Sequence, residues 1–248
     1  MKSAEKKRKK IRWEKFQHLR FETFRQFAKD PSLSYHEKSG FPDIYREGRE
    51  HAIFGDIRAK LKVLNAKGKK ILEIGPGCGP LSELLAGWCG QQEHELHLVD
   101  SEEMLALLLD TPFLIKHVGC FPEVPSLLPK HRGSFDGILI YSVFHHVFEE
   151  ADPWEFCDAA MSLLKSDGQM LLGDIPNRSK KKRFLASVKG RPVRGILKSE
   201  KRQASPGDLV ILELLARGRK KGCETYLLPQ DPRLPFANRR EDILFVKN

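Results

Sequence analysis

Apolar and polar positions along most of the chain predict short strands that alternate with helices. Short apolar runs bounded by glycine or charged residues are typical of buried strands, and an apolar residue at every third or fourth position is typical of helices. Such an alternation indicates a parallel sheet covered by helices on both faces. We expect strands at about 70–75, 95–100, 113–118, 136–141, 168–174, 223–228 and 242–247, and helices at about 80–89, 101–109, 152–165 and 205–220.

The N-terminal part of the chain shows helical spacing instead of this alternation. Apolar residues recur at helical spacing over 11–27, which predicts an amphipathic helix, and a second helix is expected at about 47–65. Between them we expect a loop that carries Tyr35, His36, Phe41 and Tyr45. The expected organisation is a basic disordered tail at 1–10, a helical cap at 11–66 and a main domain at 67–248, whose residues 175–204 form a basic loop poor in helix.

Three glycines at alternate positions follow the first expected strand. Gly75, Gly77 and Gly79 come after the apolar run that begins at Ile71, and an apolar helical pattern follows them. Glycine suits a turn in which the backbone bends tightly or touches a ligand with no Cβ in the way. A strand, a glycine turn and a helix N-terminus together direct backbone N–H groups at a bound cofactor. This unit therefore predicts a cofactor site.

Polar residues stand at the carboxyl ends of the other expected strands, where a doubly wound sheet binds its ligand. Asp100 ends the second strand, twenty-one residues after Gly79, and a carboxylate there can accept hydrogen bonds from both ribose hydroxyls. The later strands end in Gly119–Cys120, in Tyr141–Ser142 and in Asp174, with Asn177 close behind.

Two classes of cofactor compete for such a turn. A dinucleotide-binding turn reads G-x-G-x-x-G, but the sixth position here is Pro80. Glu73 stands two residues before the first glycine, where its charge would face a pyrophosphate unfavourably. A cationic sulfonium suits an acidic site better, so the residues favour S-adenosylmethionine (AdoMet) over a dinucleotide.

Four segments carry a resemblance to a known family: LEIGPGCG at 72–79, LVD at 98–100, FDGILIYSVFHHV at 135–147 and LLKSDGQMLL at 163–172. Together they resemble the class I AdoMet-dependent methyltransferases, and 35–45 with 173–177 resemble a bacterial subgroup of that family. The resemblance implies a Rossmann-like, doubly wound α/β fold with a seven-stranded sheet, mostly parallel with an antiparallel last strand, plus N-terminal helices. It implies AdoMet contacts from Glu73, Gly75, Pro76, Gly77, Cys78, Gly79, Asp100, Ser101, Met104, Gly119, Cys120, Phe121, Tyr141 and Ser142.

The family transfers a methyl group by in-line displacement, so most catalysis would come from holding the nucleophile and the methyl carbon in line. A hydroxyl nucleophile benefits from a base, for which His145 or His146 is the candidate, with Tyr141 and Asp174 as alternatives. We expect no metal, because the two histidines are adjacent and adjacent helical residues point apart. Candidate substrate contacts are Asn177, Arg183, Arg239 and Arg240.

Charge is concentrated in two segments of the chain. Residues 1–30 carry a net +7 and residues 178–203 a net +10, so a whole-chain charge of +10 leaves the remainder at −7. A basic segment after the fifth strand can attract a phosphorylated or acidic small molecule, a glycan or a carrier-bound intermediate. We expect methyl transfer to a small or glycan-like acceptor, with anionic acceptors included. The alternatives are an RNA methyltransferase and a non-catalytic AdoMet-binding module.

The remaining composition bears on the compartment and on two further activities. Five cysteines without CxxC spacing argue against a disulfide framework and favour the cytoplasm. No apolar run approaches the roughly 20 residues that span a bilayer. The chain also lacks the Asn or Asp, Pro-Pro and aromatic sequence typical of adenine N6 methylation after the fourth strand, which argues against that chemistry on nucleic acid. The oligomeric state is left open.

Overall fold

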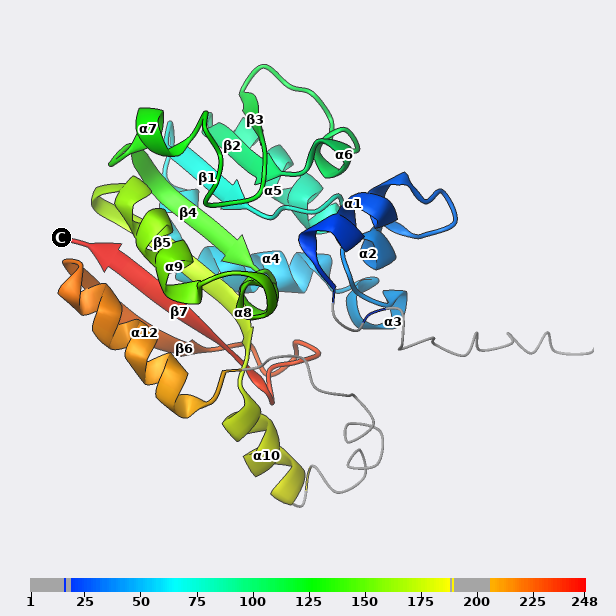
Figure 1. Cartoon of the computed structure of the whole chain (residues 1–248), viewed down its shortest axis with the longest axis vertical. Coiled ribbons are helices and arrows are strands. Elements are labelled where there is room, and N and C mark those ends of the chain that lie inside the picture. Colours follow the sequence, from blue (N-terminus) through cyan, green and yellow to red (C-terminus); the bar gives the residue numbers. More distant parts are fainter. Residues whose placement is uncertain (1–15, 17–18, 188, 190–205) are drawn as a thin grey trace, which may run out of the picture.

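The computed structural model describes Phe16 and residues 19–187, 189 and 206–248, and these residues form a seven-stranded sheet between layers of helices (Figure 1). The strands stand in the order β3-β2-β1-β4-β5-β7-β6. Strand β7 runs antiparallel to both of its neighbours, and the other paired strands among β1 to β5 are parallel. This confirms the predicted fold class. The strands are β1 (Lys70–Ile74), β2 (Glu95–Asp100), β3 (Leu114–Val118), β4 (Phe135–Tyr141), β5 (Leu164–Pro176), β6 (Cys223–Pro229) and β7 (Arg240–Lys247).

Helices lie before the sheet and on both of its faces. The N-terminal group is α1 (Phe21–Lys29), α2 (Tyr35–Lys38), α3 (Asp43–Arg46), α4 (Glu50–Lys60) and the 3-10 turn η2 (Lys62–Asn65). The others are α5 (Pro80–Gln91), α6 (Glu102–Leu105), α7 (Leu128–His131), α8 (Phe144–Glu150), α9 (Pro153–Leu163), α10 (Arg178–Ala186) and α12 (Asp208–Lys220).

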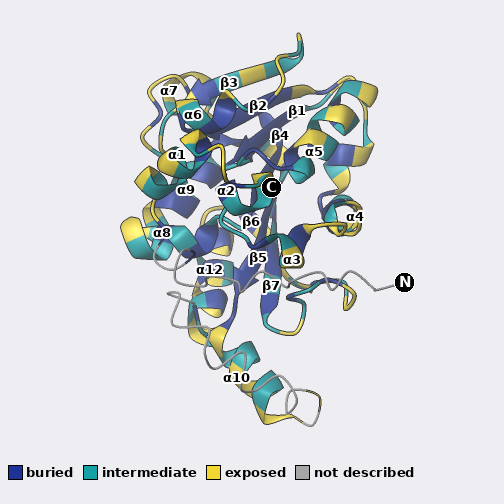
Figure 2. Cartoon of the chain, turned by 90° about the vertical axis from the view of Figure 1, so that its right-hand side faces the viewer, coloured by how far each residue is buried: buried dark blue, intermediate teal, exposed yellow. Residues whose placement is uncertain are grey.

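The strands alternate their side chains between two apolar cores, one on each face of the sheet. Leu72 and Ile74 of β1 pack into the core formed with α8, α9 and α12, whereas Ile71 packs into the core formed with α4 and α5. Buried residues line the sheet between the two helical layers (Figure 2). Alternation at period two therefore buries both faces and leaves the strand ends to carry the site.

Helix starts follow the local signals in the sequence. Asp152 accepts hydrogen bonds from the N–H groups of Trp154 and Glu155, and Pro153 fills the first position of α9. Close packing fixes other positions, because a Cβ at Gly137 on β4 would lie 2.7 Å from a methyl carbon of Val63. In the described residues no helix is both long and apolar enough to cross a membrane.

Several predicted boundaries are wrong. In the described part of the predicted 11–27 helix, α1 begins only at Phe21 and continues to Lys29, because Arg20 is extended. The predicted loop after it contains α2 and α3, and the helix predicted at 47–65 ends at Lys60 before η2. The helix predicted at 101–109 is one turn at 102–105.

The basic segment 175–204 was also predicted to be poor in helix, yet its described part forms α10. Asn177 starts this helix by accepting a hydrogen bond from the N–H of Lys180. The predicted tail at 1–10 lies outside the described residues, as does most of the part of 175–204 that follows α10. The division into cap and main domain stays a prediction.

Candidate functional site

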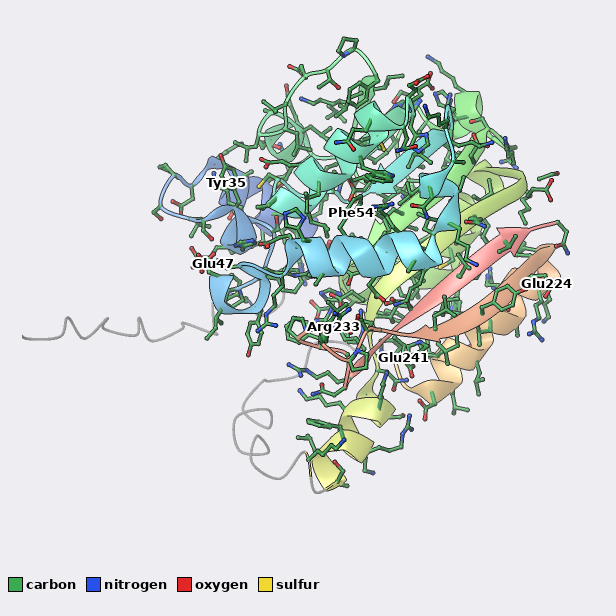
Figure 3. All side chains as sticks on the ribbon, turned by 180° about the vertical axis from the view of Figure 1, so that it is seen from behind. Tyr35, Glu47, Phe54, Glu224, Arg233 and Glu241 are labelled. Carbon is green, nitrogen blue, oxygen red and sulfur yellow. The ribbon has the colours of Figure 1, made fainter. Side chains whose placement is uncertain are left out.

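A pocket of about 410 Å³ opens at the carboxyl ends of β1, β2 and β4, beneath the N-terminal helices. Its size falls in the range of small-molecule sites, roughly 300–1,000 Å³. Apolar side chains dominate its wall, and its charged members include Arg46, Glu50, Asp100, Glu123 and Glu150. Figure 3 shows Tyr35 and Glu47 among the N-terminal helices on this side, while Glu224 lies on β6 at the opposite end. The pocket therefore has a strand-end half and a half built by N-terminal residues.

The glycine turn after β1 forms the floor of the strand-end half. Gly75 and Gly77 have φ angles of 71° and 64°, in the left-handed region that favours glycine. A Cβ at Gly75 would lie 2.5 Å from a methyl carbon of Val143, and one at Gly77 would lie 2.7 Å from the hydroxyl of Ser39. The turn thus brings bare backbone to the pocket wall, as close contact with a ligand requires.

Asp100 at the end of β2 is held by the same turn. Its carboxylate accepts hydrogen bonds from the N–H of Gly77 at 3.1 Å and from the N–H of Ser101 at 2.7 Å. Burial raises its pKa to about 6, and these two hydrogen bonds oppose the rise. Asp100 is therefore fixed in orientation and mostly ionised at neutral pH.

Glu73 lies beneath the turn, on β1, and does not line the pocket. It is 4% exposed, and burial together with the nearby charge of Asp100 raises its pKa to about 8. Its Oε2 has no hydrogen-bond partner among the described residues. A buried carboxyl oxygen without a hydrogen-bond partner is costly, so a positive charge bound near Glu73 would stabilise its ionised form.

The N-terminal residues supply aromatic rings and one cation to the other half of the pocket. Phe21, Phe24 and Phe41 line it, and the guanidinium of Arg46 lies 4.1 Å from the centre of the Phe41 ring. The N–H of Phe21 donates to Glu150 on α8 at 2.9 Å, which ties α1 across the pocket.

A network of buried ions lies behind this half of the pocket. The carboxylate of Asp174 pairs with Arg240 at 2.7 Å and with Arg46 at 3.1 Å. It also accepts hydrogen bonds from Ser142 and from the amide of Gln230. Ser142 and Asp174 both have positive φ angles, 62° and 59°, so the network holds two adjacent strand ends in strained conformations.

The two adjacent histidines differ in their surroundings. His146 lines the pocket, packs against the edge of Phe24 with 4.9 Å between ring centres, and hydrogen-bonds to the backbone of Leu19. Burial lowers its pKa to about 4. His145 is 2% exposed and does not line the pocket, and burial lowers its pKa well below its usual value. Its Nδ1 has no partner among the described residues.

Most of the predicted cofactor contacts come together in the pocket wall. Those that line it are Gly75, Pro76, Gly77, Gly79, Asp100, Met104, Gly119, Cys120, Phe121, Tyr141 and Ser142, whereas Glu73, Cys78 and Ser101 lie behind it. Ser101 accepts a hydrogen bond from the N–H of Met104 and so caps α6. Of the predicted catalytic residues, Tyr141 and His146 line the pocket, and His145 and Asp174 do not.

The predicted substrate contacts lie outside this pocket. Asn177 caps α10, and Arg183 is exposed on that helix and pairs with Asp208. Arg240 is buried against Asp174, and Arg239 stacks over the ring of Phe236 with 4.6 Å to its centre. Their assignment as substrate contacts stays a prediction, and each of them has a structural role here.

Sequence reasoning missed the pocket residues that the N-terminal segment provides. Arg46, His36 and Glu50 line the pocket, and the ring of His36 bonds to Glu50 at 2.7 Å and to Asp43 at 3.2 Å. The sequence places the aromatic residues around them in a loop and assigns that loop no function. The sequence does offer one sign of this role, because Arg46 stands next to Tyr45 and close to Phe41.

Comparisons with known proteins agree with this geometry. Residues 72–172 match the family described as methyltransferase domain. The fold resembles the plantazolicin methyltransferase BpumL in complex with SAH, at 18% identity and a TM-score of 0.60, over 95% of this chain and 98% of that one. It resembles the CurJ carbon methyltransferase at 15% identity and a TM-score of 0.58, over 92% and 64%.

A third similar structure is a chain from a complex that contains the Haloferax volcanii Trm112 methyltransferase activator, at 15% identity and a TM-score of 0.55, over 93% of this chain and 100% of that one. No curated protein matches the sequence. The sheet order, the glycine turn and Asp100 define a class I methyltransferase fold.

Proposed function

We propose that the protein binds AdoMet in this pocket and transfers its methyl group to a small acceptor held beneath the N-terminal helices. One observation carries the proposal: a single pocket joins the glycine turn and Asp100 to the aromatic wall and His146. A cofactor bound at the glycine turn and an acceptor bound at the aromatic wall would meet inside the same pocket.

The residues of the strand-end half fit AdoMet. The bare backbone of Gly75 and Gly77 can approach the ligand, and Asp100 can accept hydrogen bonds from the ribose hydroxyls. The unpartnered carboxyl of Glu73 lies behind the turn, where a ligand with a sulfonium and an ammonium group lowers the cost of ionising it. A dinucleotide would instead bring phosphate charges toward this carboxyl.

When bound, AdoMet supplies a methyl carbon activated by the adjacent positive sulphur. The protein contributes position, because an in-line arrangement can account for several kcal/mol of the barrier, up to about 7–11 in the best cases. Phe21, Phe24 and Phe41 exclude water from the acceptor half and restrict where the acceptor lies. Tyr141 keeps its proton, since burial raises its pKa well above 10, so it acts as a hydrogen-bond donor.

His146 is the best placed group to remove a proton from the acceptor. It lines the pocket and hydrogen-bonds to the backbone of Leu19, and its low pKa of about 4 keeps the ring neutral at neutral pH. His145 does not reach the pocket, and Asp174 is committed to two arginines. We therefore assign the role of base to His146.

The wall of the pocket favours a small and largely apolar acceptor. Glu50, Glu123 and Glu150 line it in addition to Asp100, whereas Arg46, the one arginine among the described residues of its wall, already pairs with Asp174. No residue of the basic helix α10 lines the pocket. These charges favour a neutral acceptor over an anionic one, and a wall rich in phenylalanine favours rings or aliphatic chains.

Incubation with methyl-labelled AdoMet and fractions of a host extract, with and without nuclease, tests the proposal. We expect a labelled product of low molecular mass that resists nuclease and that His146→Ala reduces by roughly 100-fold, the usual range of a general base. His51→Ala serves as the control, because this histidine is exposed and outside the pocket.

Each alternative gives a different result in this experiment. A label in nuclease-sensitive material would overturn the small acceptor in favour of RNA. Tight AdoMet binding by calorimetry without any labelled product would indicate the non-catalytic module. NADH binding without AdoMet binding would contradict the whole proposal.

A further inference from the structure

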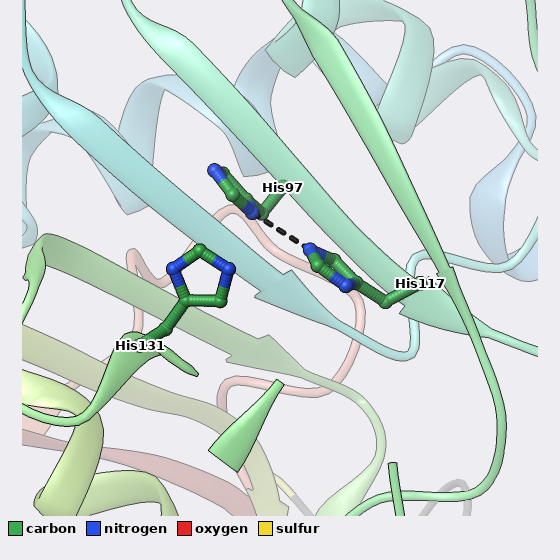
Figure 4. A group of neighbouring side chains, drawn as sticks. All are labelled: His97, His117 and His131. Carbon is green, nitrogen blue, oxygen red and sulfur yellow. Dashed lines mark hydrogen bonds between the residues drawn. The ribbon is translucent and has the colours of Figure 1, made fainter. Parts of the chain in front are cut away.

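Three histidines outside the pocket meet near the edge of the sheet. His97 on β2, His117 on β3 and His131 at the end of α7 each offer a ring nitrogen, and these atoms lie within 4.8 Å of one another (Figure 4). His97 and His117 are buried, and their rings stack with 5.0 Å between centres and 13° between planes. None of the three lines the pocket described above.

His97 and His117 each use one ring nitrogen toward an outer partner. Nε2 of His97 lies 2.6 Å from the carboxylate of Glu95, and Nδ1 of His117 lies 3.0 Å from the hydroxyl of Ser126. The inner nitrogens, Nδ1 of His97 and Nε2 of His117, lie 2.7 Å apart. The carboxylate behind His97 and the hydroxyl behind His117 are the kind of partners that orient histidines at metal sites.

We propose that His97, His117 and His131 bind one zinc ion, with water as the fourth ligand. Three imidazoles suit zinc, which takes nitrogen ligands in tetrahedral sites, whereas calcium and magnesium require oxygen ligands. Burial and the neighbouring histidines lower the pKa of His117 to about 4, and those of His97 and His131 are also lowered. All three rings are therefore neutral at neutral pH, as metal binding requires.

Zinc binding needs local shifts of the rings, because the three ligand nitrogens lie within 4.8 Å of one another and not at tetrahedral spacing. Two nitrogens on one tetrahedral zinc ion stand roughly 3.3 Å apart, given bonds of about 2.0–2.1 Å, so the inner nitrogens of His97 and His117 would separate by about 0.6 Å. The proton between these nitrogens would move to the outer Nδ1 of His117, which would then donate to Ser126. The binding leaves the number of protons on the histidines unchanged.

Lys70 is the group that opposes the metal. Its ammonium lies 3.3 Å from Nδ1 of His131 and 3.0 Å from Glu95. The lysine side chain is 27% exposed, so it can turn toward solvent when the ion binds. Removal of this cation by Lys70→Met should therefore strengthen zinc binding, a result that a set of histidines held only by hydrogen bonds would not give.

The ion would brace an edge of the sheet that borders the pocket. Strand β3 is the edge strand, and the segment between His117 and His131 contains Gly119, Cys120 and Phe121 of the pocket wall. A metal bound to both ends of this segment would hold it closed as a loop and limit its opening. The proposal does not depend on methyl transfer, because the site stands outside the pocket.

The test is a calorimetric titration of the chelator-treated full chain with Zn²⁺, followed by Co²⁺ absorption spectra. We expect one ion per chain, a melting temperature that rises with zinc, and visible bands of tetrahedral cobalt without thiolate charge transfer. His131→Gln and His117→Gln should weaken binding at least 10-fold, while the exposed His51→Gln control should not. His131 is half-buried and is the variant expected to fold without difficulty.

Three results would overturn the proposal. The first is absence of saturable zinc binding in the micromolar range, which would mean that the histidines form only a hydrogen-bonded chain from Ser126 to Glu95. The second is equal affinity in wild type and His131→Gln. The third is thiolate charge transfer to cobalt, which would place the ion at a cysteine.

Discussion

Replacing Glu73 by glutamine should stabilise the protein without ligand, and the gain should grow with pH. Glu73 is 4% exposed, its pKa is raised from 4.5 to about 8 by burial first and by Asp100 second, and its Oε2 lacks a partner among the described residues. The pKa of Glu73 is higher in the folded protein than in the unfolded chain. Its contribution to the free energy of unfolding is therefore fully present below pH 4.5 and is lost as pH rises from 4.5 to 8. Glutamine keeps the shape and removes this dependence.

The size of the effect on stability follows from the pKa shift of Glu73. At pH 7 the folded protein holds a proton that the unfolded chain would release, and this costs about 1.36 kcal/mol for each pH unit above 4.5. The cost is about 3 kcal/mol at pH 7 and below about 1 kcal/mol at pH 5. The buried amide of Gln also needs hydrogen-bond partners, so about 3 kcal/mol is an upper bound on the stability gained by Glu73→Gln. The test therefore uses the change of this gain with pH.

Urea unfolding of wild type and Glu73→Gln at about pH 5, 6 and 7 measures this difference. The exposed Glu224→Gln is the matched control for loss of one carboxyl group. We expect the stability difference between Glu73→Gln and wild type to widen by about 2 kcal/mol over this range, because all other titrating groups are shared. A constant difference would refute the assignment of a buried, mostly protonated Glu73. The same variant should bind AdoMet more weakly, as the cofactor gains from the ionised form.

Three further changes have defined outcomes. Asp100→Asn should weaken AdoMet binding at least 10-fold by calorimetry, since an amide would present a donor as well as an acceptor to the ribose. Gly75→Ala should lower the free energy of unfolding by at least about 1 kcal/mol, because φ is positive and the new methyl meets Val143, whereas Gly87→Ala in α5 has free space and should be neutral or stabilising. Asp174→Asn should cost about 3–5 kcal/mol, because it leaves two buried guanidinium groups without their counter-charge, and the loss should appear in urea unfolding.

Much of the fold could be predicted from the sequence because its strands obey a local rule. Buried strands are short apolar runs, and their ends carry glycine, aspartate or serine, so the strand positions and the strand-end half of the pocket follow from the sequence pattern. The seven-stranded sheet with an antiparallel last strand came from the family resemblance. The predicted ends of helices are wrong where tertiary contacts decide them. The helix α10 forms in a segment rich in lysine and arginine because Asn177 caps it and Asp208 pairs with Arg183, and Asp208 lies beyond the end of the segment.

The parts of the site that could not be predicted depend on contacts between distant segments. Arg46 reaches Asp174, 128 positions away, and the network that they form with Ser142 exists only once β4 and β5 lie side by side. The histidine cluster has the same origin, since the pairing of β2 with β3 places His97 and His117 on one face. Sequence spacing of 20 residues between these two gives no sign of a shared site.

The division of the pocket suggests where the choice of acceptor resides. The match to the methyltransferase domain begins at residue 72 and contains the glycine turn, Asp100 and His146. The rings of Phe21, Phe24 and Phe41 lie before it, and they form the wall that would touch the acceptor. Ser39 packs against Gly77 of the turn and Arg46 donates a hydrogen bond to Ser142, so the segment after α1 supports both halves of the pocket, whereas α1 supplies Phe21 and Phe24 to the acceptor half. We therefore expect exchange of α1, residues 21–29, with the corresponding helix of a class I methyltransferase to alter the acceptor and to leave AdoMet affinity nearly unchanged, as measured by product mass and by calorimetry.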